Sequence, residues 1–196
     1  MHENPSDHLK PNQEQLALRV EVATPRDWQA YKKIRLHAIR TDAEMLGISM
    51  RDARGEVMRG DEEWKRILAR PDYHLVVLSW NGNEPVGMGV AVNNGIFYYP
   101  NDKNTWELGS DYVRKEFRGQ NLQRKMIAFR LKEIINQGGT KVLFHVLANN
   151  RWSIPNAEHF GFSKMKERLG DKDYFMQLDL TDPLLKEKIN AVLDAG

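Results

Sequence analysis

The sequence predicts a mixed α/β fold, in which one domain has a long central sheet flanked by helices. The chain has 196 residues, of which 41% are hydrophobic and 29% charged, and this suits one domain with a sizeable core. Apolar residues recur every three to five positions over 121–137, which predicts an amphipathic helix. The near-continuous apolar run over 141–148 predicts a strand that is buried on both faces.

The other elements follow from local patterns. Apolar and polar residues alternate over 18–23, which predicts a first strand. Thr24 as N-cap and Pro25 in the first turn predict a helix from about residue 27 to 40. Segment 41–60 stays ambiguous, because it mixes apolar residues with glycines. The remaining predicted elements are helices over 61–69, 153–160 and 182–193 and strands over 73–80, 85–92, 105–113, 162–166 and 174–180.

Turns and termini complete this outline. Asn81-Gly82-Asn83 predicts the turn of a hairpin. Gly87 and Gly89 in the returning strand predict a bulge or a close approach by another group. We expect a polar and aromatic loop over 93–104, a flexible N-terminal tail over 1–17 and a C-terminal helix within 182–196.

Composition excludes several classes of function. Without cysteine the chain has no disulfide, Cys-ligated zinc, iron–sulfur cluster or thiol nucleophile, which suits a cytoplasmic protein. The net charge of +2 gives no support to nucleic-acid binding. No apolar run approaches the ~20 residues of a membrane span, and residues 1–12 lack the apolar core of a signal peptide. His145 and His159 have no partner at metal-ligand spacing, so we expect no metal site. The balanced charge and the absence of a long apolar run lead us to expect no nucleic-acid partner and no membrane partner.

Three motifs occur in order between residues 106 and 162. A strand that ends in Glu107-Leu108-Gly109-Ser110-Asp111-Tyr112-Val113 is followed by Arg118-Gly119-Gln120-Asn121-Leu122-Gln123. The amphipathic helix and its following strand come next. The third motif begins with the Asn-x-x-Ser pattern Asn150-Arg151-Trp152-Ser153 and ends with Gly161-Phe162. A Thr-x-x-Asp-Trp helix start at 24–28 and an acid and a tryptophan at 62–64 precede these motifs. Together, these features resemble the GNAT superfamily of acyl-CoA N-acyltransferases over about 18–180.

The resemblance implies a single-domain GNAT-type fold over 18–181, with a central, mixed and mostly antiparallel twisted sheet of about six to seven strands. It also implies acetyl-CoA as co-substrate. The turn over 118–123 would bind the pyrophosphate through free backbone N–H groups and the helix dipole. Tyr112 and Val113 would pair with the pantetheine amides through their backbone. The full set of implied cofactor-binding residues is Tyr112, Val113, Arg118, Gly119, Gln120, Asn121, Leu122, Gln123, Arg124, Asn150 and Asn156.

The pyrophosphate turn departs from the family pattern at two positions. The family usually has glycine at the position of Asn121 and glycine or alanine at that of Gln123. Asparagine tolerates a left-handed backbone well, so the turn can survive. The Gln123 side chain either donates a hydrogen bond to the phosphates or blocks them. Arg124, Lys125 and Arg130 either attract the phosphates or form a solvated basic face.

Direct attack of an amine on a thioester needs a base and a donor for the leaving thiolate. Glu107 is the base candidate, and the alternative is a strand-edge acid in a salt bridge. The tyrosine acid of many relatives would fall at Ala157, so Ser153 is the candidate donor; its alternative role is helix capping. Asn150 either binds pantetheine or closes the turn before the helix. Gly109 is the candidate for the bulge at which the sheet splays.

The leading hypothesis is therefore an N-acetyltransferase that moves an acetyl group from acetyl-CoA to a primary amine of a small molecule or a protein N-terminus. The alternative is a coenzyme A-binding or catalytically degenerate module with a regulatory or interaction role. A nucleic-acid protein is a third reading, which the balanced charge disfavours. The acceptor site would be framed by residues 31–61 and 93–105. Monomer and homodimer both stay open.

Overall fold

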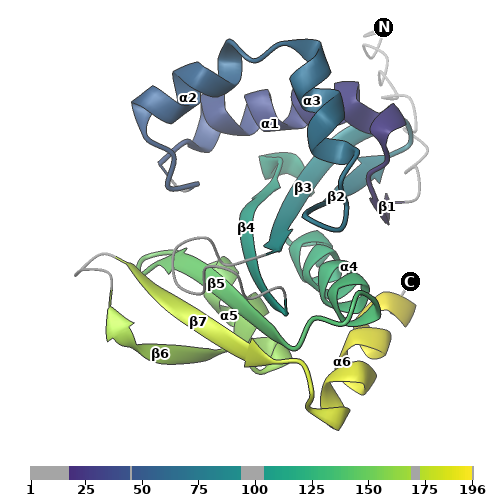
Figure 1. The fold of residues 1–196 in the computed structure, drawn as a ribbon, viewed down its shortest axis with the longest axis vertical. Coiled ribbons are helices and arrows are strands. Elements are labelled where there is room, and N and C mark those ends of the chain that lie inside the picture. Colours follow the sequence, from purple (N-terminus) through teal and green to yellow (C-terminus); the bar gives the residue numbers. More distant parts are fainter. Residues whose placement is uncertain (1–17, 45, 94–103, 169–172, 196) are drawn as a thin grey trace, which may run out of the picture.

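The computed structural model describes residues 18–44, 46–93, 104–168 and 173–195. The elements are β1 (Leu18–Val22), η1 (Pro25–Asp27), α1 (Trp28–Asp42), α2 (Met50–Val57), α3 (Asp61–Leu68), β2 (His74–Asn81), β3 (Glu84–Asn93), β4 (Thr105–Val113), η2 (Lys115–Phe117), α4 (Leu122–Asn136), β5 (Lys141–Leu147), α5 (Ser153–Phe160), β6 (Ser163–Arg168), β7 (Asp173–Asp179) and α6 (Pro183–Asp194). The described strands form one seven-stranded sheet in the order β1-β2-β3-β4-β5-β7-β6 (Figure 1). Only β4 and β5 pair in parallel. The predicted α/β fold, with a mixed and mostly antiparallel sheet, is confirmed.

Most predicted elements are present near their predicted ends. The Thr24 cap is confirmed, because the Asp27 carboxylate accepts from the Thr24 amide and hydroxyl at 2.8 Å. The ambiguous segment 41–60 contains α2, whose first turn is capped by Ser49 Oγ accepting from the Asp52 amide at 3.1 Å. The predicted tail and all but the ends of the predicted loop over 93–104 lie outside the described residues. None of the described helices is long and apolar enough to cross a membrane.

Alternating side chains build a hydrophobic core on each face of the sheet. One core joins β2, β3 and β4 to α4, α5 and α6; its members include Leu75, Ala91, Leu108, Ile127, Leu131, Phe160 and Leu185. The other core joins the same strands to α1 and α3; its members include Val76, Leu78, Met88, Tyr31, Ile34 and Trp64. Figure 1 shows α1, α2 and α3 grouped at one end of the molecule, with α4 and α6 together on the other side of the strands. The C-terminal helix therefore belongs to the same packed unit as the sheet.

A bulge interrupts β4 and changes its direction. In the pairing with β3, Tyr112 lies opposite Met88 and Gly109 opposite Val90, so Ser110 and Asp111 together face Gly89. Ser110 has a φ of 56°, in the left-handed region, so the predicted position of the bulge at Gly109 was wrong by one residue. The close approach predicted at Gly89 is confirmed. A Cβ atom there would lie 2.7 Å from Arg130 Cζ and from Asp111 Oδ1.

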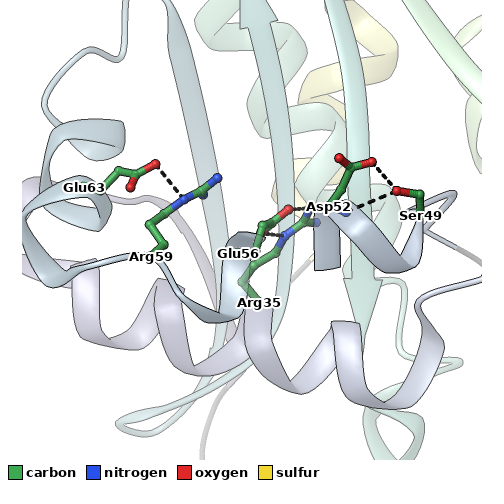
Figure 2. Close-up of polar contacts among 6 residues, drawn as sticks. All are labelled: Arg35, Ser49, Asp52, Glu56, Arg59 and Glu63. Carbon is green, nitrogen blue, oxygen red and sulfur yellow. Dashed lines mark hydrogen bonds and ion pairs between the residues drawn. The ribbon is translucent and has the colours of Figure 1, made fainter. Parts of the chain in front are cut away.

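An ion pair holds α2 against α1 (Figure 2). Arg35 Nε and NH2 donate to the two carboxylate oxygens of Glu56 at 2.8 and 2.6 Å, and the two side chains are only 8% and 14% exposed. Arg59 forms a second ion pair with Glu63 at 2.9 Å, which links the end of α2 to α3. Nearby, burial lowers the pKa of His74 to about 4, and the positive charges of Arg35 and Arg59 act in the same direction.

His74 is therefore predicted to make folding sensitive to acid. Its pKa is about 4 in the folded chain against an ordinary 6.5, so the unfolded chain takes up the proton first. The stability that neutral His74 contributes is present above pH 6.5 and is lost as the pH falls toward 4. Urea unfolding at pH 7 and at pH 5 measures this loss. Between the two pH values, the free energy of unfolding should fall by about 2 kcal/mol less in the His74→Gln variant than in wild type.

The control is His159→Gln. Partial burial also lowers the pKa of His159, but most of this side chain is exposed. That variant should keep most of the wild-type loss. Equal losses in wild type and His74→Gln would contradict the assignment.

Candidate active site

A cleft opens where β4 and β5 separate. The two strands pair only between Thr105–Leu108 and 141–144, and they diverge after the bulge. The cleft has a volume of about 350 Å³, and a smaller cavity of about 50 Å³ adjoins it between Gly109–Asp111 of β4 and 144–147 of β5. Four residues line both spaces: Leu46, Asp111, Asn150 and Ser153. The splay predicted for this region is therefore present, and it leads from the surface toward the centre of the sheet.

The loop before α4 borders the cleft with two residues in the left-handed conformation. Gly119 has a φ of 80° and Asn121 a φ of 58°, so the left-handed backbone predicted for Asn121 is confirmed. Asn121 precedes Leu122, the first residue of α4. The amides that open a helix have no acceptor within it, and the helix dipole makes this end positive. The loop therefore offers backbone donors to an anion in the cleft.

Most of the sequence-predicted residues line this cleft. They are Tyr112, Val113, Arg118, Gly119, Asn121, Leu122, Gln123, Asn150, Ser153 and Asn156. The described lining leaves out Gln120, which is exposed in the loop, Arg124, which reaches α5, and Glu107. Sequence reasoning did not single out Asp42, Phe117, Trp152 or Asp111, which also line it.

Arg118 spans one end of the cleft. Its Nε donates to the Val113 carbonyl at 2.9 Å, and its NH2 pairs with Asp42 at the end of α1 at 2.6 Å. The guanidinium also lies 6.0 Å from the centroid of the Tyr112 ring. Arg118 therefore ties the loop to both walls of the cleft through its side chain.

The backbone of β4 presents Val113 to the cleft. Arg114 donates its amide to Val86 of β3 at 2.8 Å. Because backbone groups alternate along an antiparallel strand, those of Tyr112 point toward β3 and those of Val113 point away from it. The Tyr112 ring instead packs toward α1, where its hydroxyl lies 2.9 Å from His37 Nδ1 and 3.1 Å from Thr41 Oγ1. Backbone pairing of Tyr112 and Val113 with a ligand stays a prediction.

Gln123 turns its side chain toward α5. Its Nε2 donates to Ser153 Oγ at 2.8 Å, and its Oε1 accepts from Asn156 Nδ2 at 3.0 Å. Arg124 Nε donates to the same Asn156 at 3.3 Å. Both alternatives drawn from the sequence place the Gln123 amide at the phosphates, and they stay predictions. The side chain connects the start of α4 to the start of α5.

Asn150 shapes the turn into α5. Its Oδ1 accepts from the backbone amides of Ser153 at 3.0 Å and Trp152 at 3.3 Å. Ser153 is the first residue of the helix and not its N-cap, so the capping role considered for it was wrong. The turn-closing role of Asn150 is confirmed, and its contact with pantetheine stays a prediction. Ser153 is consequently placed with its side chain between the two cavities.

Glu107 lies on β4, and the described lining of the smaller cavity begins on that strand at Gly109. Glu107 is two residues from Gly109, and side chains two apart in a strand share a face. β4 is a central strand, so the reading of Glu107 as a strand-edge acid was wrong. Burial raises the pKa of Glu107, and the nearby His145 acts in the opposite direction. A half-buried carboxyl with a raised pKa is suited to proton transfer.

A buried ion pair lies under the bulge, and sequence reasoning missed it. Arg130, in the middle of α4, is 0% exposed and pairs with the 4% exposed Asp111 at 2.5 Å. Arg130 also donates to the carbonyls of Val90 at 2.8 Å and Met126 at 3.1 Å. Both earlier readings of Arg130, as a phosphate ligand or part of a solvated face, were therefore wrong. The sequence features that could have indicated this ion pair are an arginine on the apolar side of α4 and a glycine-containing strand.

The Asp111 carboxylate also lies near the Gln123 side chain. Burial raises the pKa of Asp111, while the neighbouring Arg130 and Gln123 side chains oppose that rise. Burial likewise lowers the pKa of Arg130, and the charge of Asp111 opposes this. The ion pair therefore lies close to the Gln123–Ser153 hydrogen bond, and among the described residues neither Asp111 oxygen has a hydrogen-bond partner.

The fold and the splayed strands match the acyltransferase class. The model of the acetyltransferase (GNAT) family matches residues 34–162, well over half of the chain. The chain belongs to this family. No match was found among curated proteins.

Solved structures agree on the fold. The yncA protein of Salmonella typhimurium, solved with its cofactor acetyl-CoA, is 21% identical with a TM-score of 0.65, and the match covers 85% of this chain and 95% of that one. The paia N-acetyltransferase of Thermoplasma acidophilum, in complex with coenzyme A, is 13% identical with a TM-score of 0.64, over 84% and 99% of the two chains. An N-acetyltransferase of Staphylococcus aureus Mu50 is 18% identical with a TM-score of 0.61, over 84% and 99%. At these identities the likeness establishes the fold alone.

The buried pair should behave as one unit in stability measurements. Arg130→Met and Asp111→Leu each leave one uncompensated buried charge, so each should lower the free energy of unfolding by about 3–5 kcal/mol. The double variant removes both charges and should recover most of that loss. Urea unfolding of the four proteins measures the coupling. A double variant as unstable as the sum of the two single variants would contradict the pairing.

Proposed function

We propose that this chain is an N-acetyltransferase that moves an acetyl group from acetyl-CoA to a primary amine of a small molecule or of a protein. The observation that carries the proposal is the opening between β4 and β5, which is bordered by the left-handed loop and the start of α4. Family membership supports acetyl transfer as the chemistry. The relatives from Thermoplasma acidophilum and Staphylococcus aureus are N-acetyltransferases, which supports an amine as the acceptor.

The residues of the cleft fit coenzyme A. Gly119 and Asn121 set the turn that leaves the first amides of α4 free for a pyrophosphate. Gln123 leaves that end open, because its side chain is engaged with α5. The Val113 amide faces the same space and suits an extended amide-bearing arm. Acetyl-CoA would thus lie along β4 with its thioester toward the smaller cavity.

The proposed reaction is direct attack. The amine nitrogen forms a bond to the acetyl carbon, the C–S bond breaks, and its electron pair leaves on sulfur. Glu107 accepts the proton that the amine nitrogen loses, directly or through water, which its raised pKa favours. Ser153 borders both cavities and donates a hydrogen bond to the thiolate as negative charge develops on it.

A coenzyme A-binding module without catalysis is the second candidate. It is favoured by Ala157, which stands where many relatives have a tyrosine and is 0% exposed in the core. Such a module would bind coenzyme A through the loop and lack a phenol at the thiolate.

Calorimetry and thiol release separate the two candidates. Titration with acetyl-CoA should give saturable heat, and a panel of amines should release free coenzyme A thiol in the presence of the protein. Binding without release across the panel would favour the module. Absence of any heat or thermal shift with acetyl-CoA would contradict both.

Glu107→Gln should slow the reaction and change its pH profile. The carboxylate must be ionised to accept a proton, so kcat/KM in wild type should fall as the pH drops through the raised pKa of Glu107. In Glu107→Gln this acid limb should disappear, and kcat should fall on the order of 100- to 10,000-fold. Glu187→Gln, an exposed change on α6, is the matched control. An unchanged acid limb in Glu107→Gln would rule Glu107 out as the base.

A further inference from the structure

The Ser153 hydroxyl has one proton and two lone pairs, and its partners decide where the proton points. One lone pair accepts from Gln123 Nε2 at 2.8 Å. The amide nitrogen of Gln123 cannot accept a hydrogen bond, so the proton of Ser153 is not used in that contact. Among the described residues, no acceptor is engaged by Ser153 Oγ, and its side chain borders both cavities. The contact with Gln123 therefore leaves the O–H free to point into the cleft.

The orientation of the Gln123 amide is fixed at both of its ends. Asn156 Nδ2 donates to the Trp152 carbonyl at 2.9 Å and to Gln123 Oε1 at 3.0 Å, so it can only present donors to that oxygen. The Nε2 end donates to Ser153 Oγ, and the negative charge of the Asp111 carboxylate lies near the same end without a hydrogen bond to it. A flipped amide would place its oxygen against that carboxylate. The arrangement thus holds Gln123 as a donor to Ser153.

We propose that Gln123 is a positioning residue, which fixes Ser153 so that its hydroxyl donates a hydrogen bond to the departing thiolate of coenzyme A. This inference rests on the proposed acetyl transfer and names the origin of its leaving-group stabilisation. Gln123 does not touch the reacting atoms. A donor to an oxygen polarises the O–H bond, so the hydroxyl becomes a better hydrogen-bond donor.

The proposal also explains two departures from the family pattern together. Ala157 removes the phenol that relatives place near the sulfur, and Gln123 replaces a small residue at the start of α4. A glycine at position 123 would leave Ser153 Oγ without its amide donor and free to rotate. The two changes are linked, because a serine hydroxyl that takes over the role of the tyrosine needs a partner that sets its direction.

Three variants and one control test the proposal. They are Gln123→Met, which keeps the volume and removes the amide, Ser153→Ala, the double variant, and Gln137→Met at the exposed far end of α4. Ser153→Ala and Gln123→Met should each lower kcat on the order of 10-fold or more and change the KM for acetyl-CoA less than about 3-fold. The double variant should be no slower than Ser153→Ala within about 2-fold, because both changes remove one function. Gln137→Met should match wild type.

A second readout does not need turnover. The ultraviolet absorbance of the thiolate gives the pKa of the thiol in bound coenzyme A. A hydrogen bond from Ser153 favours the thiolate, so Gln123→Met and Ser153→Ala should each raise that pKa by about one unit relative to wild type, a tenfold change. If the protein binds coenzyme A without acetylating any amine, the proposed function fails and this shift still decides the role of Gln123.

Three outcomes overturn the proposal. The first is an equal thiol pKa in wild type, Gln123→Met and Ser153→Ala. The second is a Gln123→Met variant that weakens acetyl-CoA binding and leaves kcat unchanged, which would assign Gln123 to the phosphates. The third is a double variant whose loss in kcat is the product of the two single losses. Thermal unfolding of each variant identifies any loss that comes from misfolding, and Gln123→Leu then replaces Gln123→Met.

Discussion

The geometry of the cleft depends on the buried ion pair between Arg130 and Asp111. Asp111 lies in the β4 bulge, and Arg130 reaches it from the middle of α4 at 2.5 Å. Burying both charges is unfavourable unless further contacts compensate, and Arg130 also donates to the carbonyls of Val90 and Met126. Losing the bulge would strand Arg130 without its partner. The bulge and the pair therefore lie together at the point where β4 and β5 stop pairing, and the cleft opens there.

The backbone around the pair is adapted to it. Gly89 lies opposite the bulge, and any Cβ there would overlap Arg130 and Asp111 at 2.7 Å. Ser110 adopts a left-handed φ of 56°, a conformation that non-glycine residues avoid and that persists only where the surroundings hold it. One strained residue and one obligatory glycine thus accompany the ion pair. The ion pair, Gly89 and the left-handed Ser110 therefore depend on one another.

The sequence predicted the elements well and the long-range side-chain contacts poorly. β4 and α5 match their predicted ranges, because alternation, helical spacing and Gly161 with its left-handed φ of 101° are local signals. The role of Arg130 was wrongly predicted, because a helical pattern shows on which face of the helix a residue lies and not which group it meets. That group is here an aspartate on β4. The partner of Gln123 is likewise 30 residues away. Such contacts depend on how elements pack, which a single sequence does not state.

The proposed phosphate recognition and the proposed thiolate stabilisation use different parts of the same segment. The loop presents backbone amides, and these need only the left-handed turns at Gly119 and Asn121. Because backbone recognition tolerates a new side chain wherever the turn is kept, position 123 is free to carry glutamine. That glutamine lies beside the ion pair under the bulge and donates to Ser153, which borders both cavities. In the proposed reaction, the residues beside the ion pair thereby also orient the hydroxyl that would face the leaving group.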